Sequence, residues 1–180
     1  MNQSLAPIPK EFPGRQYIIS LIRGWIDKNT RDKILNEMRS LDREKLMDVL
    51  NSLLYDSDPY LQSYAIDVLM ALDRQHAVSL LLPLLNASEA EMRWFICDLL
   101  ADDGDERAIE PLIKVLLEDP DDSVRLMAAV ALRHIGDTRA IPSLEYAMNH
   151  DKGADEEGRR IDKAAKEAIN AILSRARPSG

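Results

Sequence analysis

Hydrophobic and polar positions along this chain follow the period of an α-helix. Within residues 108–116, apolar side chains are spaced three and four positions apart, which places them on one face of a helix. These residues are Ala108, Ile109, Leu112, Ile113, Val115 and Leu116. Runs of Val, Ile, Thr and Tyr that alternate with polar residues, as in strands, are missing from the sequence. The pattern therefore predicts an all-α fold.

The helical pattern is itself repeated. Residues 104–112 and 136–144 agree at six of nine positions and start 32 residues apart. The second half of the unit recurs at 61–69, 92–100 and 124–132, with offsets of 31 and 32 residues. A period near 32 that contains two helical patterns and short turns is typical of a solenoid of helix pairs. We therefore expect an α-α superhelix.

The predicted elements form one repeat domain with a tail at each end. Helix pairs are predicted at 42–54 with 59–72, 76–85 with 89–101, 106–118 with 121–135, and 138–148 with 160–175. The domain spans 16–175, with a degenerate pair at 16–40 that covers the apolar end of the array. Its repeats lie at about 42–73, 74–104, 105–136 and 137–175. We expect a flexible, Pro-containing tail at 1–15 and a disordered tail at 176–180.

Turn residues indicate where the helices begin and end. Asp and Ser in the turns are suited to cap the helix that follows, and Gly136 is suited to end a helix in the left-handed conformation. The last pair is interrupted by an insertion within 150–159, relative to the repeat before it. The two glycines and clustered charges of this segment predict an exposed loop, whose role the sequence leaves open.

Charge and cysteine content narrow the classes of partner. The formal net charge is −8 and the pI about 4.9, which disfavours nucleic acid and anionic membranes. Cys97 is the single cysteine, so an intrachain disulfide is excluded, and we expect a packed, inert thiol. No apolar stretch approaches the about 18 residues of a membrane span, and residues 1–15 lack the apolar core of a signal peptide. We expect a soluble, cytoplasmic protein.

Patterns for catalysis or metal binding are missing as well. The histidines His76, His134 and His150 show no paired spacing, and His134 suits the end of a helix, where it favours the negative end of the dipole. The acidic loop does not fit a calcium-binding pattern, because Gly153 and Glu156 stand where an oxygen ligand and a glycine are needed. We expect a non-enzymatic protein without a cofactor or a metal ion.

The segment 119–137, which reads DPDDSVRLMAAVALRHIGD, resembles the HEAT repeat, and more narrowly the HEAT-like repeats named for phycobilisome (PBS) lyases. The likeness covers about 105–148 and reaches back to Leu41, while Gln62 and the segment 94–97 depart from it. It implies a short right-handed solenoid of about four to five armadillo-like helix pairs, with a concave face lined by the second helices. Such repeats are mostly scaffolds for protein binding, and in the lyases they support attachment of a bilin.

Arg93 and Arg125 occupy matched positions one repeat apart. The resemblance implies that such an arginine joins an acidic residue of a turn, here Asp119 or Asp121, and so links neighbouring repeats. Arginine forms geometrically specific pairs with carboxylates, which agrees with this role. The alternative is a row of guanidinium groups that binds anions. We expect the first of these roles, a structural ladder in which arginine–aspartate pairs link neighbouring repeats.

A candidate binding surface follows from the register of the second helices. If Val124, Ala128 and Leu132 face the core, helical geometry turns another set of positions toward the concave face. This set is Ser63, Asp67, Trp94, Asp98, Leu126, Val130 and Arg133. A tryptophan in an apolar centre with charged flanks is typical of a binding hot spot. The alternative is that Trp94 packs between adjacent second helices.

The expected function is that of a protein–protein interaction module whose partner binds on the concave face. A bilin- or phycobilisome-related lyase, or a lyase accessory, is an alternative, for which Arg93, Arg125 and Arg133 are the only candidates to hold propionate groups. Nucleic-acid binding by helical repeats is a further alternative, and so is self-association. The sequence does not identify the partner.

Overall fold

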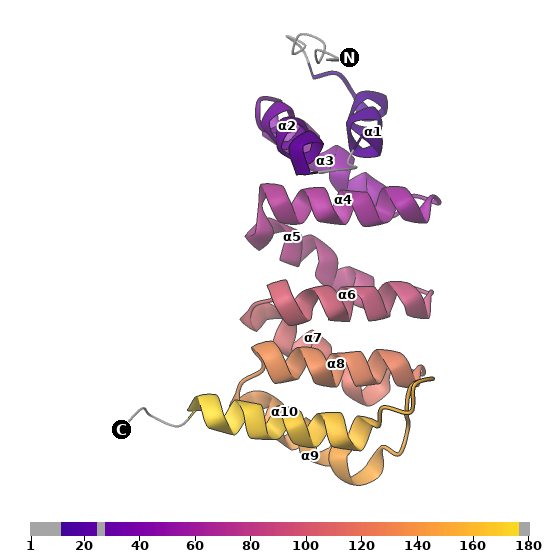
Figure 1. Cartoon of the computed structure of the whole chain (residues 1–180), viewed down its shortest axis with the longest axis vertical. Helices are drawn as coiled ribbons and strands as arrows, with labels where there is room; N and C mark the ends of the chain where they lie inside the picture. Colours follow the sequence, from indigo (N-terminus) through magenta and orange to yellow (C-terminus); the bar gives the residue numbers. More distant parts are fainter. Residues whose placement is uncertain (1–11, 25–27, 177–180) are drawn as a thin grey trace. The chain divides into compact units, whose positions relative to one another are not determined.

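The computed structural model describes residues 12–24 and 28–176, and its contacts divide the chain into two compact units, Met1–Ala77 and Val78–Gly180. The described residues form helices joined by short turns, and their one isolated β-bridge joins Ala154 to Arg160, so the predicted all-α class is confirmed (Figure 1). The boundary between the units lies within α5 (Arg74–Leu81), inside the predicted domain 16–175. No helix in the described part of the chain is long and apolar enough to cross a membrane.

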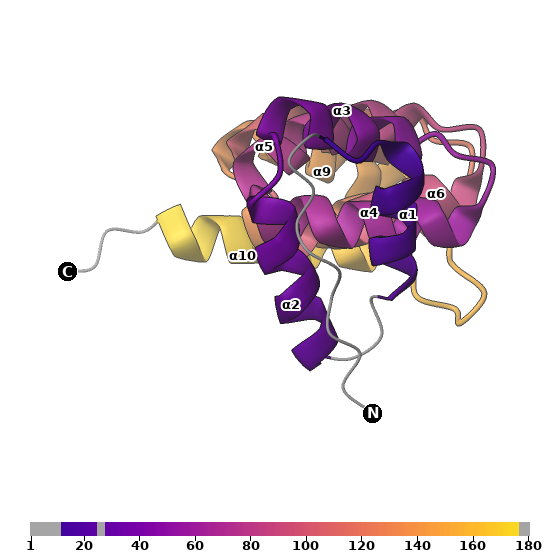
Figure 2. The same cartoon turned by 90° about the horizontal axis from the view of Figure 1, so that it is seen from above.

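The first unit contains α1 (Arg15–Arg23), α2 (Lys28–Arg39), α3 (Arg43–Leu53) and α4 (Pro59–Leu72). The degenerate pair predicted at 16–40 therefore forms two helices. Both helices contact α4, and they run across its direction instead of along it (Figures 1 and 2). The hydroxyl of Tyr17 on α1 donates a hydrogen bond to the buried carboxylate of Glu37 on α2, which ties the two helices together.

The predicted tails lie largely outside the described residues. This holds for 1–11 of the tail expected at 1–15 and for 177–180 of the tail expected at 176–180. The remaining parts belong to helices or their flanks, since α1 begins at Arg15 and α10 ends at Ala176.

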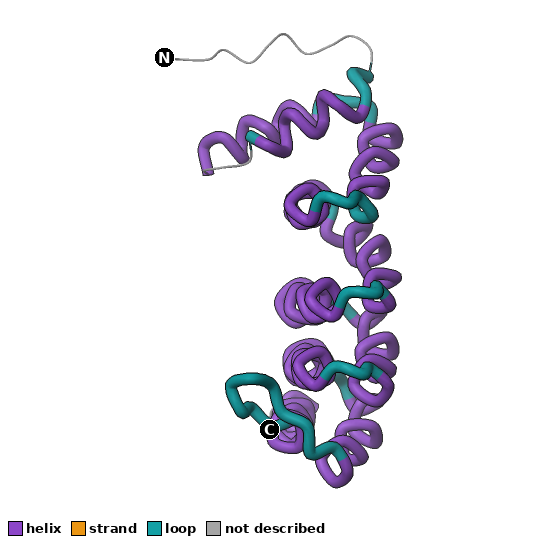
Figure 3. The backbone as a smooth tube through the Cα atoms, turned by 90° about the vertical axis from the view of Figure 1, so that its right-hand side faces the viewer, coloured by secondary structure: helices purple, strands orange, loops and turns teal. Residues whose placement is uncertain are grey.

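The second unit consists of helices in two layers. Its elements, among which η marks a short 3-10 helix, are the end of α5, η1 (Leu82–Asn86), α6 (Ala90–Asp103), η2 (Glu106–Ala108), α7 (Ile109–Glu118), α8 (Asp122–Ile135), η3 (Thr138–Ala140), α9 (Ile141–His150) and α10 (Ile161–Ala176). The second helices of the pairs, α6, α8 and α10, lie side by side in one layer, and α7 and α9 lie in the other (Figure 3). The observed bounds lie within a few residues of the predicted pairs.

The first helices of the pairs differ from prediction, because one end of each is a short 3-10 turn. Pro83 lacks a backbone N–H and cannot continue an α-helix, so the predicted helix 76–85 ends at Leu81 and passes into η1. In the next two repeats, Asp105 and Asp137 cap η2 and η3. Their side chains accept the backbone N–H groups of Arg107 at 3.0 Å and Arg139 at 2.9 Å.

The prediction that Gly136 ends its helix in the left-handed conformation is wrong. Its φ and ψ are −66° and 154°, and Gly104 is similar, with −71° and 170°. A Cβ atom at Gly136 would lie 2.3 Å from the carbonyl oxygen of Leu132 and 3.2 Å from Cδ1 of Ile172. Glycine is needed there because the chain passes close to its own helix and to α10 of the following repeat.

The insertion within 150–159 forms a small ordered hairpin. Asp155 is its centre, since its carboxylate accepts backbone N–H groups of Glu157 at 3.1 Å and Arg159 at 2.8 Å. Gly158 has a φ of 77°, which favours glycine. Figure 3 shows this segment as the large teal loop beside the last helix. It extends past the layer of second helices on their open side, which is the side that faces away from α7 and α9. As predicted, the tip at 156–159 is exposed.

Candidate partner-binding face

On α6, the structure brings together two of the predicted site residues. Trp94 and Asp98 are four positions apart and therefore lie one turn apart on the same face of the helix. Trp94 is half-buried and Asp98 is exposed. Among the described residues, the indole N–H of Trp94 has no hydrogen-bond acceptor and no ion pair engages Asp98. An aromatic ring and a carboxylate are thus at least partly exposed on one face of α6.

The predicted residues on α8 differ in their exposure. Val130 and Arg133 are half-buried and stay part of the candidate face, and Arg133 Nη1 donates to Glu167 Oε2 on α10 at 3.1 Å. Leu126 was expected on this face but is only 4% exposed. The expectation failed because α8 packs against α6, α7 and α10 together, which buries more than one stripe of its surface.

Ser63 and Asp67 lie on α4 and belong to the first unit, so they form a separate candidate surface. Ser63 is half-buried and Asp67 is exposed. Although Asp67 as a whole is exposed, nearby protein atoms partly desolvate its carboxyl and raise its pKa, and the positive charge of Arg31 on α2 opposes that rise.

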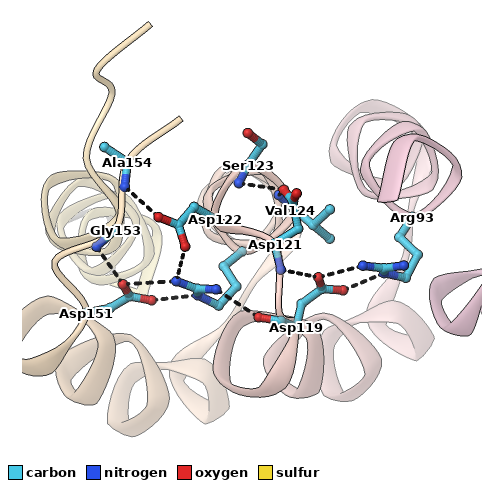
Figure 4. A network of polar contacts seen from close by, with 10 residues as sticks. Arg93, Asp119, Asp121, Asp122, Ser123, Val124, Asp151, Gly153 and Ala154 are labelled. Carbon is cyan, nitrogen blue, oxygen red and sulfur yellow. Dashed lines mark hydrogen bonds and ion pairs between the residues drawn. The ribbon is translucent and has the colours of Figure 1, made fainter. Parts of the chain in front are cut away.

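Arg93 forms the first step of an arginine–aspartate ladder along the turns of the second unit (Figure 4). Its Nε donates to Asp119 Oδ2 at 2.6 Å, and its Nη2 donates to Asp119 Oδ1 at 2.9 Å. Nη1 donates to the carbonyl oxygens of Ala87 and Ser88, both at 2.9 Å. The hydrogen bonds to Asp119 raise the pKa of Arg93, so this buried guanidinium stays charged.

Arg125 forms the second step in the same way. Its Nε donates to Asp151 Oδ2 at 2.8 Å, and its Nη1 donates to the carbonyl of Asp119 at 2.8 Å. Burial works against ionisation of Asp151, but hydrogen bonds from Arg125 and the Gly153 N–H lower its pKa. Asp121, the other predicted partner, instead caps α8 by accepting the N–H groups of Ser123 at 2.9 Å and Val124 at 3.1 Å.

The first unit contains a related pair that the sequence comparison of repeats did not predict. Arg15 of α1 donates to the carboxylate of Asp56, which also accepts the N–H of Asp58 at 2.9 Å. Gln62, which stands at the arginine position, donates to the carbonyl of Asp56 at 2.7 Å. The signal in the sequence was the Asp-x-Asp turn, which recurs at 56–58 and 119–121. The arginine could not be found because it comes from outside the repeat pattern.

Two side chains with catalytic potential, those of Cys97 and His134, lie in different surroundings. Cys97 is completely buried, and this burial raises the pKa of its thiol to about 12, with a further contribution from the negative charge of Asp119. His134 lies on the exposed end of α8, where its Nδ1 is 4.0 Å from Asp102 Oδ1. Within 12–24 and 28–176, no three side chains of the metal-binding types converge on one point.

A groove of about 850 Å³ on the first-helix side was not predicted. It lies between η1 and α7 and is lined by apolar side chains, and its charged groups are acidic residues, one lysine and Arg93 of the ladder. The principal residues are Leu82, Pro83, Leu85, Pro111, Lys114 and Val115. Pro83, near the end of the predicted helix 76–85, was the available signal, because it marks the change to the 3-10 turn η1 that lines the groove.

Comparison with known proteins gives the class of the fold. Residues 78–162 match the family of HEAT repeats, whereas no curated protein sequence matches the chain. A designed armadillo repeat protein in complex with the peptide (KR)4 is 20% identical, with a TM-score of 0.51 over 91% of this chain and 87% of that one. A computationally designed armadillo repeat protein for modular peptide recognition gives 20% and 0.50, again over 91% and 87%.

An engineered protein is similar at 20% identity and a TM-score of 0.51, over 88% of this chain and 80% of that chain. At this identity the likeness concerns the fold alone. The chain thus has an α-helical repeat fold similar to that of designed armadillo repeat proteins, and its residues 78–162 match the family of HEAT repeats.

Proposed function

We propose that this protein is a non-catalytic interaction module that binds a segment of another protein on the open side of α6, α8 and α10. The observation that carries the proposal is the pairing of half-buried Trp94 with exposed Asp98 on one face of α6, together with half-buried Val130 on the neighbouring helix α8. Aromatic side chains with partly exposed apolar area are enriched at the energetic centres of protein interfaces.

The scaffold beneath the face supports a rigid binding surface. The ion pairs of the ladder, buried at Arg93 and partly buried at Arg125, fix the turns before α6, α8 and α10 with hydrogen bonds of defined geometry. A face whose backbone is held in this way loses little conformational entropy when a partner binds. The designed armadillo protein in complex with (KR)4 has a similar fold and binds a peptide, which makes a peptide segment a reasonable partner here.

The alternatives have less support. Arg93 and Arg125, two of the three candidate groups for bilin propionates, are engaged by Asp119 and Asp151. The third, Arg133, pairs with Glu167. Nucleic-acid binding needs several exposed cations, and the one basic residue of α6 is the buried Arg93.

The test is a pull-down from lysate of the source organism with wild type and a Trp94→Ala/Asp98→Lys variant of equal helicity. In parallel, a photo-crosslinking amino acid is placed at Val130, and at Glu145 on α9 as a control. We expect capture to be lost in the folded double variant and cross-links to form from position 130 only. Equal cross-linking from both positions, or capture that survives the double substitution, would refute the proposed face.

A further inference from the structure

We propose that Trp94 and Asp98 form a subsite for a cationic side chain, an arginine or a lysine, of the bound protein segment. This inference rests on the function proposed above and specifies the chemistry of the partner. It follows from the geometry of the two residues, from the charges around them, and from the residues at the equivalent positions of the neighbouring helices.

The geometry of the pair suits a cation with an apolar stem. Because Trp94 and Asp98 are one helical turn apart, a side chain that lies on the indole ring can place its charged end at the carboxylate. The ring attracts the cation through its quadrupole, and the carboxylate accepts charge-assisted hydrogen bonds. Asp98 is exposed, and no ion pair in the described part of the chain occupies it.

The charges around the pair favour a positive ligand. The exposed charged residues of α6 are all acidic, namely Glu91, Asp98 and Asp102. Arg93 is the only basic residue of the helix, and it is buried with Asp119. The exposed surface of α6 therefore contributes negative charge, and Arg133 on the neighbouring helix α8 is paired with Glu167. The sign of this charge agrees with the net charge of −8.

The equivalent positions of α8 and α10 do not repeat the subsite. On α8 they are Leu126, which is buried, and Val130; on α10 they are Lys163 and Glu167. A bound segment is therefore expected to carry its essential cation at α6 and an apolar side chain at Val130. Packed helices lie about 8–10 Å apart, and an extended chain advances about 3.3 Å per residue, so these two partner residues are about three positions apart.

The subsite can be tested with synthetic peptides and one nuclear resonance. In a Trp25→Phe background, checked for unchanged helicity, the indole N–H of Trp94 gives a single tryptophan side-chain signal in a ¹⁵N–¹H spectrum. The probe is the octapeptide (KR)4, and the neutral octapeptide (SQ)4 is its control. We expect a saturable shift of the Trp94 signal with (KR)4 and none with (SQ)4.

Two charge reversals separate the subsite from general attraction to an acidic protein. Asp98→Lys and Glu145→Lys change the net charge equally, but Glu145 is exposed on α9, in the other layer. We expect Asp98→Lys to weaken (KR)4 binding at least about tenfold and Glu145→Lys to weaken it less than about threefold. Equal weakening by the two variants, or a Trp94 signal that does not move, would overturn the subsite.

The outcome of this test is distinct from that of the proposed function. If a partner cross-linked at position 130 is still bound by Asp98→Lys, the binding face stands and the cationic subsite is wrong. If no partner cross-links at position 130 at all, both the proposed binding face and the proposed subsite are refuted.

Discussion

Asp119 accepts hydrogen bonds from two N–H groups of Arg93 and at the same time closes its own turn, because its Oδ1 also accepts the backbone N–H of Asp121 at 2.9 Å. The opposite edge of the guanidinium is bound by the carbonyls of Ala87 and Ser88. The pair therefore joins the turn before α6 to the turn before α8 (Figure 4). The side chains of Arg93 and Asp119 are only 10% and 5% exposed, so water screens this link little.

Removal of Asp119 should destabilise the second unit strongly. Asp119→Ala leaves the buried Arg93 charge without its carboxylate, so we expect the free energy of unfolding to fall by about 3 kcal/mol. Chemical denaturation followed by circular dichroism measures this change. Glu167→Ala is the control, because it removes the exposed partner of Arg133 and should cost no more than about 0.5 kcal/mol. Similar losses of stability in the two variants would show that the buried pair of the ladder stabilises the protein no more than an exposed ion pair does.

Two glycines should respond differently to the same substitution. Gly136→Asn places a Cβ against the carbonyl of Leu132 and near Ile172, and we expect a loss of about 3 kcal/mol. Gly158→Asn should change stability by no more than about 0.5 kcal/mol. Gly158 has a φ of 77°, which asparagine tolerates, and no atom lies within 4 Å of its Cβ position. Thermal unfolding of the two variants provides the comparison, and a tolerated Gly136→Asn would contradict the close approach.

The sequence predicted the helices well because the 32-residue period provides several independent examples of each element. It failed where the outcome depends on what a neighbouring repeat presents. Leu126 has a position on α8 that a single-helix pattern places outside the core, yet contacts with several helices bury it. The sequence around Gly136 predicts an ordinary helix end. Only the structure, in which Ile172 of α10 lies close to Gly136, shows why a side chain is excluded there.

The candidate site was predictable to the extent that it depends on a single helix. Trp94 and Asp98 follow from the spacing along α6, whereas the pairing of Arg15 with Asp56 connects residues 41 positions apart without a repeat to align. The groove between η1 and α7 depends on how a 3-10 turn packs against a helix, which hydrophobic spacing does not encode.

Acid should weaken the second unit through Asp162. The hydrogen bonds of this carboxylate with Arg160 lower its pKa to about 2, whereas an unfolded aspartate has a pKa of about 3.9. Since the folded pKa is the lower one, the stabilisation is present above about pH 4 and is lost as the pH falls toward 2. Denaturation midpoints at pH 5 and pH 3 should therefore differ less in Asp162→Asn than in wild type. An unchanged difference would mean that other carboxylates determine the acid sensitivity.

Cys97 should report the opening of the second unit. Its thiol is fully buried and its pKa is raised to about 12, so the thiolate is scarce at pH 8 and iodoacetamide should not modify the folded protein. Modification then requires unfolding, and where refolding is faster than alkylation its rate follows the unfolded population. Because about 1.4 kcal/mol corresponds to a factor of ten, Asp119→Ala should accelerate modification about a hundredfold, and Glu167→Ala about twofold. Mass spectrometry of the single cysteine measures both rates, and rapid modification of the folded wild type would show that the thiol is accessible without unfolding.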